Sequence, residues 1–238
     1  MKKSLLLTLF LILSALISHA AAQGDIRVKC SNFTMNVISE NTHCYQILEN
    51  NPVSFEAGPE EIAKAQIANI AISFSDLANL NNTIEPEVTF YLIDDLMKTS
   101  IALVDPVMGL RDILENINNG DMPIDSITTP VPFLPYQTDQ QVTAKLLKII
   151  NFENGSGLRS VIAFQDPISA NQGSSNLYYS WQGQSTDTRY YISAVFPLTS
   201  SALDGKSPNS VDWNSLSSKD FQPSLDQLDY YIRSIVIE

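Results

Sequence analysis

The chain has 238 residues, of which 44% are apolar and 17% charged, with nine glycines and twelve prolines. This profile is typical of a globular protein and excludes collagen-like, coiled-coil and wholly disordered classes. Acidic residues outnumber basic ones by 26 to 14, which gives a formal net charge of −12. A surface this negative repels phosphate backbones and anionic lipid headgroups, so the composition argues against binding to nucleic acids or membrane surfaces.

The N-terminus has the pattern of a secretory signal peptide. Lys2 and Lys3 precede an apolar, leucine-rich run over 4–17, and alanines at 20–22 form a small-residue cleavage site before Gln23. The run is about 14 residues long, whereas a membrane-spanning helix needs about 20. We therefore predict a signal peptide over 1–22 and a soluble mature protein, secreted or periplasmic, that is not inserted in a membrane. A retained membrane anchor is the alternative.

Cys30 and Cys44 are the only two cysteines in the sequence. In an oxidising compartment such a pair predicts a disulfide bond. Closing a loop of about 15 residues would stabilise the fold by roughly 3 kcal/mol. Polar and apolar residues alternate over 31–37, so we expect the bridge to join a strand or hairpin. A catalytic thiol or a metal site is the alternative, but there is no Cys-x-x-Cys, and His43 is the only histidine left after removal of 1–22.

The sequence predicts a disulfide-stapled N-terminal segment over 23–52 and a single α+β domain over 53–238. Pro59, followed by two glutamates, predicts a short helix, because proline suits the first helical position and carboxylates suit the N-terminal dipole. Alternating apolar residues predict a strand over 68–74, and a β-branched and aromatic run predicts another over 88–93.

A helix is predicted over 105–117, starting at Asp105-Pro106 and ending at Asn118-Asn119-Gly120. The proline-marked loop that follows, through Pro135, is long for a compact domain. It is either a packed functional loop or a flexible one.

The C-terminal half predicts a β-meander. Strands are expected at 141–152, 158–165, 177–181 and 190–196, and Asn154-Gly155 has the chemistry of a hairpin turn. Apolar residues at helical spacing predict a helix over 223–232. The predicted fold class is α+β, an antiparallel meander sheet of about four to six strands with one face covered by helices, including the C-terminal helix. A PsbP-like α/β/α sandwich is the alternative.

Several motifs occur in a fixed order: Pro-Phe-Leu-Pro at 132–135, Asn-Phe-Glu-Asn-Gly-Ser-Gly-Leu-Arg at 151–159, Leu-Tyr-Tyr-Ser-Trp-Gln-Gly at 177–183, Tyr-Tyr-Ile-Ser-Ala-Val-Phe-Pro at 190–197 and Pro-Ser-Leu-Asp-Gln-Leu-Asp at 223–229. In this order they resemble a family of exported bacterial proteins and lipoproteins of the Chloroflexi and Cyanobacteria type. The resemblance covers about 88–237 and implies export. It implies no activity, cofactor or catalytic residue, and this chain lacks the lipid-attachment cysteine of the lipoprotein members.

The chain carries few residues for catalysis. A single mature histidine and two paired cysteines favour neither a nucleophile–histidine–acid arrangement nor a zinc site. Paired carboxylates suffice for glycoside hydrolysis, and Asp94 with Asp95, or Asp121 with Asp125, are the candidates; a solvated acidic surface is the alternative. Calcium binding by Asn118, Asp121 and Asp125 matches no EF-hand spacing. We predict no catalytic residue, no metal site and no cofactor.

Aromatic residues in the 177–196 hairpin are the candidates for ligand binding. Tyr179, Trp181 and Tyr191 would stack on sugars or contact a protein if they faced solvent. The alternative is cross-strand aromatic pairing inside the sheet, with one face under a helix.

These observations favour a non-catalytic binding or interaction module of the cell envelope or extracellular space, with a protein or glycan as partner. A carboxylate-based hydrolase acting on extracellular polysaccharide is the alternative, and a matrix component without a small ligand is a third. An exposed face with Tyr179 and Trp181 would favour binding. A concave pocket shared by Asp94 or Asp95 and another carboxylate would favour the hydrolase.

Overall fold

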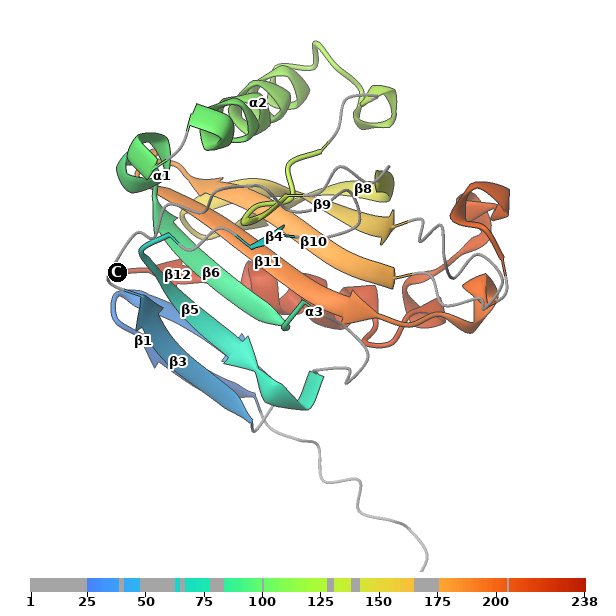
Figure 1. Ribbon diagram of the computed structural model, residues 1–238, viewed down its shortest axis with the longest axis horizontal. Helices are drawn as coiled ribbons and strands as arrows, with labels where there is room; N and C mark the ends of the chain where they lie inside the picture. The colour runs from blue at the N-terminus through green and yellow to red at the C-terminus, as the bar shows by residue number, and fades with distance from the viewer. Residues whose placement is uncertain are drawn as a thin grey trace, which may run out of the picture.

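The computed structural model describes residues 25–38, 41–47, 63–64, 67–77, 84–99, 101–127, 131–137, 142–164, 176–204 and 206–238 (Figure 1). The signal peptide expected over 1–22 and the helix expected to start at Pro59 lie outside these residues, while Ala63–Lys64 form the short strand β4.

An antiparallel sheet of seven strands forms the centre of the described structure. In spatial order its strands are β3 (Thr42–Ile47), β5 (Asn69–Phe74), β6 (Glu87–Leu92), β11 (Tyr190–Leu198), β10 (Asn176–Ser185), β9 (Gly155–Phe164) and β8 (Val142–Phe152). The predicted meander is confirmed as the consecutive strands β8 to β11. The sheet is larger than expected because β6, β5 and β3 extend it beyond β11.

Two details of the meander differ from the prediction. The first hairpin turn consists of Glu153 and Asn154, because Gly155 already pairs with Phe152. In β8, the register shifts between Lys145 and Lys148, where Leu146 has a φ of 54°. Such a bulge inserts an extra residue and exchanges the faces of the strand. The simple alternation expected over 141–152 therefore holds only on either side of Leu146.

The N-terminal strands join the rest of the fold. β1 (Ile26–Cys30) pairs with β2 (Phe33–Val37), and β2 pairs with the C-terminal strand β12 (Val236–Ile237) in a three-stranded sheet. The expected disulfide is present, linking Cys30 of β1 to Cys44 of β3 with the two Cα atoms 5.7 Å apart. Because β3 is an edge strand of the large sheet, the described part of 23–52 contributes to both sheets.

The helices lie on opposite faces of the large sheet (Figure 1). α1 (Ile93–Thr99) and α2 (Ile101–Asn118) cover one face together with the buried segment 131–136, and we call this packing layer the α2-side core. α3 (Leu225–Arg233) and the three-stranded sheet pack on the other face, which we call the α3-side core. The described structure is therefore rich in antiparallel sheet, as predicted, but the expected single face covered by helices, including the C-terminal helix, is not found.

Most predicted helices and strands occur with shifted ends. α2 begins four residues before the expected start, so Pro106 lies inside it, and α1 was not predicted. α3 starts after Ser224, whose hydroxyl accepts a hydrogen bond from the Gln227 amide, as is usual at a helix N-terminus. The short 3₁₀ turns are η1 (Ser75–Leu77), η2 (Ile124–Ser126), η3 (Ser201–Leu203), η4 (Pro208–Ser210), η5 (Trp213–Ser215) and η6 (Ser218–Asp220).

Candidate functional site

The aromatic residues expected to bind a ligand lie in the interior. Tyr179, Trp181 and Tyr191 are each 0% exposed. Trp181 donates a hydrogen bond from Nε1 to the carbonyl of Ile150, and the Tyr191 hydroxyl donates to Oε1 of Gln182. No ring face of these three residues is open to solvent, so they form no exposed binding surface. They match the alternative, aromatic packing in the interior of the sheet.

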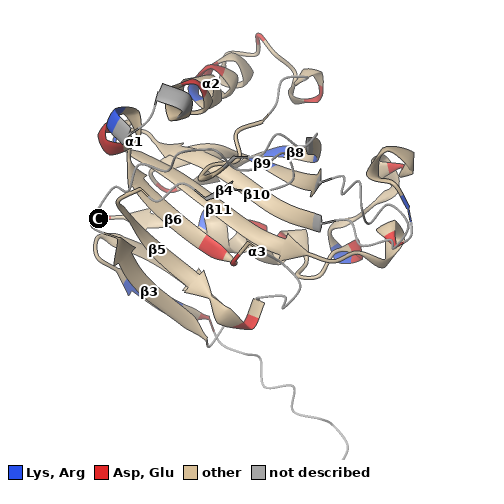
Figure 2. Ribbon diagram, viewed as in Figure 1, with Lys and Arg blue, Asp and Glu red and all other residues tan. Residues whose placement is uncertain are grey.

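The candidate carboxylates are dispersed. Asp94 and Asp95 lie in the first turn of α1, while Asp121 and Asp125 lie beyond the end of α2. Figure 2 shows acidic residues spread over α1, α2 and the C-terminal turns. Within the described ranges, no group of three or more histidine, cysteine, aspartate or glutamate side chains could hold a metal ion.

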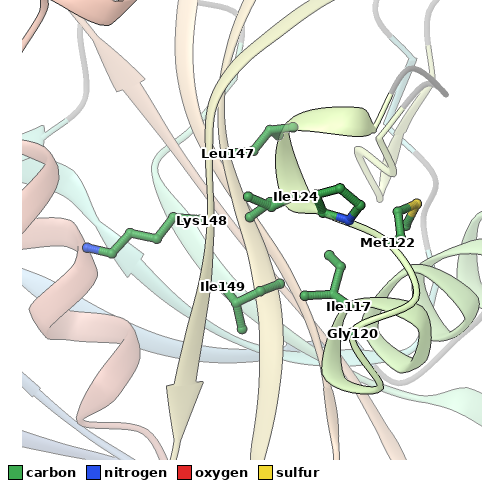
Figure 3. Close-up of a pocket in the computed structure, with 8 residues that line it drawn as sticks. Ile117, Gly120, Met122, Ile124, Leu147, Lys148 and Ile149 are labelled. Carbon is green, nitrogen blue, oxygen red and sulfur yellow. The ribbon is translucent and has the colours of Figure 1, made fainter.

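A pocket of about 570 Å³ opens between the end of α2, η2 and strand β8 (Figure 3). Its walls are mainly apolar, and it is lined by Ile117, Gly120, Met122, Pro123, Ile124, Leu147, Lys148 and Ile149. The Lys148 side chain points away from the pocket, toward the opposite face of the sheet. None of the candidate carboxylates lines it.

Backbone hydrogen bonds at the end of α2 position one wall of the pocket. The amide of Gly120 donates to the carbonyl of Ile117, and the amide of Met122 donates to that of Asn116. Gly120 has a φ of 78°, a conformation that glycine adopts without strain. This tight turn reverses the chain and brings Met122 and η2 back against β8.

The β-bulge positions the other wall. Because the bulge at Leu146 exchanges the faces of β8, Leu147 and Ile149 both pack on the α2 side, while Leu146 and Ile150 pack on the α3 side. Without the extra residue, alternation from Ala144 would turn Lys148 toward α2. The bulge thus makes the pocket wall apolar and directs the Lys148 ammonium to α3.

Glu87 is a buried carboxylate that sequence reasoning missed. It is 1% exposed, and it accepts hydrogen bonds from the hydroxyls of Tyr45, at 2.6 Å, and Tyr136, at 3.4 Å. Burial, reinforced by the Glu87 charge, raises the pKa of both tyrosines well above the usual value. These hydroxyls therefore remain protonated donors that hold the carboxylate. In the sequence, the available signal was a glutamate directly before the strand predicted over 88–93.

A second charged cluster, also missed, lies in the α3-side core. Asp229 of α3 is 0% exposed, and its carboxylate contacts the Lys148 ammonium at 3.0 Å and the Arg233 guanidinium at 3.7 Å. The Tyr179 hydroxyl donates to Asp229 at 3.2 Å. Burial and the Asp229 charge raise the pKa of Tyr179, so this hydroxyl stays a donor. The cluster fixes α3 to strands β8 and β10.

No helix in the described part of the chain has the length and apolar character needed to cross a membrane. No protein-family model matches the chain, and the search of curated proteins finds no match. The resemblance based on the ordered motifs therefore stays a prediction.

Proposed function

We propose that this protein is an exported, non-catalytic binding module that takes a small, mainly apolar ligand into the pocket between α2, η2 and β8. The pocket itself carries the proposal. Its volume of about 570 Å³ lies within the range of small-molecule sites, roughly 300–1,000 Å³. An apolar lining favours an apolar ligand, or an apolar side chain of a protein partner, because the hydroxyls of a glycan would find few hydrogen-bond partners there.

The disulfide supports the proposed location. Cys30 and Cys44 are bonded, and such bonds persist in oxidising compartments such as the periplasm and the extracellular space. Together with the signal peptide predicted over 1–22, this favours a secreted or periplasmic protein. The motif order that resembles exported bacterial proteins points the same way.

A neutral apolar fluorophore tests the proposal. N-phenyl-1-naphthylamine gains fluorescence in apolar surroundings and carries no charge that would interact with the ionic clusters. We expect saturable binding to the wild-type protein. Met122→Glu should weaken binding at least tenfold, because it places a carboxylate in the apolar wall.

Met108→Glu is the matched control. Met108 lies on α2, is 37% exposed and does not line the pocket. This variant should bind the fluorophore like the wild type. Equal binding by the Met122→Glu variant and the wild type, or no saturable binding at all, would contradict the proposed site.

A further inference from the structure

The charged cluster of the α3-side core contains more positive than negative charge. Lys148 of β8 and Arg233 of α3 contact the single carboxylate of Asp229. Arg159 of β9 lies beside Lys148, and its charge acts on the Tyr179 hydroxyl that donates to Asp229. Lys148 and Arg159 are direct cross-strand partners, so their side chains leave the same face of the sheet. The next partner of Arg159, on β10, is Trp181. Three cations and one anion leave an excess of two positive charges in a protein whose formal net charge is −12.

The Asp229 carboxylate is occupied by other residues. Its Oδ2 contacts Lys148 and Arg233, and its Oδ1 accepts from Tyr179. Arg159 is only 8% exposed, and among the described residues its Nε has no hydrogen-bond partner. Arg159 is therefore a buried cation whose Nε–H donor has no acceptor in the described part of the chain.

Such an arrangement is costly unless something else compensates the charge. A guanidinium does not lose its proton in proteins, so Arg159 cannot avoid the cost by becoming neutral. Burying a charged group with a donor that lacks an acceptor is strongly unfavourable. A bound oxyanion would remove this cost, since the planar fork of donors on arginine matches phosphate and carboxylate oxygens.

We propose that Arg159, with the Lys148 ammonium beside it, binds a small oxyanion carrying two negative charges, a phosphate or sulfate group. The two charges of such a group equal the local excess. The site has a route to solvent, because the side chains of Lys148 and Arg233 are 44% and 50% exposed. It lies on the face of the sheet opposite the apolar pocket, as the direction of Lys148 in Figure 3 shows, and it goes beyond the proposed function.

Thermal unfolding in millimolar inorganic phosphate, sulfate or chloride at matched ionic strength tests the site. Binding to the folded state raises the melting temperature. We expect phosphate or sulfate, but not chloride, to raise it for the wild type, and the anion that acts identifies the ligand class. Arg159→Met should abolish the shift, and Arg159→Lys should weaken the affinity about tenfold, because lysine lacks the planar fork. Arg189→Met, at an exposed turn position, is the control and should respond like the wild type.

The anion-free samples separate binding from a purely structural role. If Arg159 is an uncompensated cation, Arg159→Met should unfold at a higher temperature than the wild type in chloride, because an apolar side chain replaces a buried charge. A lower melting temperature in chloride would show that Arg159 already has a partner and would overturn the proposal. A wild type that responds to neither phosphate nor sulfate would overturn it as well.

Discussion

The indole ring of Trp181 lies against two glycines. A Cβ atom on Gly157 would be 2.5 Å from Cζ2 of the ring, and a Cβ atom on Gly183 would overlap the ring directly. These glycines face each other across β9 and β10, so the ring fills the space that two side chains would otherwise occupy. Glycine is required at both positions because the indole ring approaches the backbone closely, and not because of an unusual backbone conformation. This explains why Gly-Ser-Gly and Trp-Gln-Gly occur on adjacent strands.

Gly183→Ala should therefore lower the free energy of unfolding by about 1–3 kcal/mol, because overpacking forces a rigid ring to move. Chemical denaturation followed by tryptophan fluorescence measures the change. Gly109→Ala is the control: it lies within α2 with no atom within 4 Å of an added Cβ. It should raise stability by about 0.5–1 kcal/mol, because alanine favours a helix interior. Equal effects of the two changes would contradict the proposed packing of Trp181.

At the scale of single elements, the buried ion pair fixes α3 to the sheet. Asp229 is buried, whereas the side chains of Lys148 and Arg233 are 44% and 50% exposed, so removing the carboxylate leaves neither of them as a buried charge. It removes hydrogen bonds to a charged group, which are worth about 1.5–3 kcal/mol. Asp229→Asn should thus strongly destabilise the protein, since Lys148 and Arg233 both lose their carboxylate. The measurement is urea denaturation.

Asp226→Asn provides the comparison on the same helix. Asp226 is exposed in the first turn of α3, where a carboxylate interacts favourably with the helix dipole. Its loss should cost less than about 1 kcal/mol. If the Asp229 variant were no less stable than the Asp226 variant, the ion pair would not be what fixes α3.

A helix or strand could be predicted from the sequence where residues close to it in the chain determine its structure. The four meander strands follow from alternating residues and turn chemistry within a few positions. The bulge does not, because Leu146 carries no sequence sign of its positive φ. β12 is two residues long and pairs with β2, about 200 positions earlier, so nothing near Val236 indicates it.

The candidate sites were harder to predict than the strands. The aromatic hairpin was visible in the sequence, but whether Tyr179 and Trp181 face solvent depends on α3 and the small sheet that cover them. Arg159 was visible as one charge in an apolar strand. That its Nε lacks an acceptor in the described part of the chain is a tertiary property. The pocket is one as well, because it requires the bulge of β8 and the turn at Gly120 together.

At the scale of the whole molecule, the disulfide joins the two sheets. Cys30 is buried in the α3-side core, whereas Cys44 lies on the edge strand of the large sheet. Replacing both cysteines with serine should reduce the free energy of unfolding by roughly 3 kcal/mol, because the unfolded chain regains the freedom of a loop of about 15 residues. Thermal unfolding measures this loss. Alkylation with and without reductant, read by mass spectrometry, should modify both cysteines only after reduction.

The proposed function requires that the pocket between α2, η2 and β8 binds an apolar ligand. An isoleucine-methyl NMR titration of the protein with N-phenyl-1-naphthylamine tests this directly. We expect saturable shifts at Ile117, Ile124 and Ile149, which line the pocket. The buried Ile192 in the α3-side core and the exposed Ile26 on β1 should stay unchanged. Shifts centred on Ile26 or Ile192, or no saturable shift at the pocket isoleucines, would contradict the proposed function.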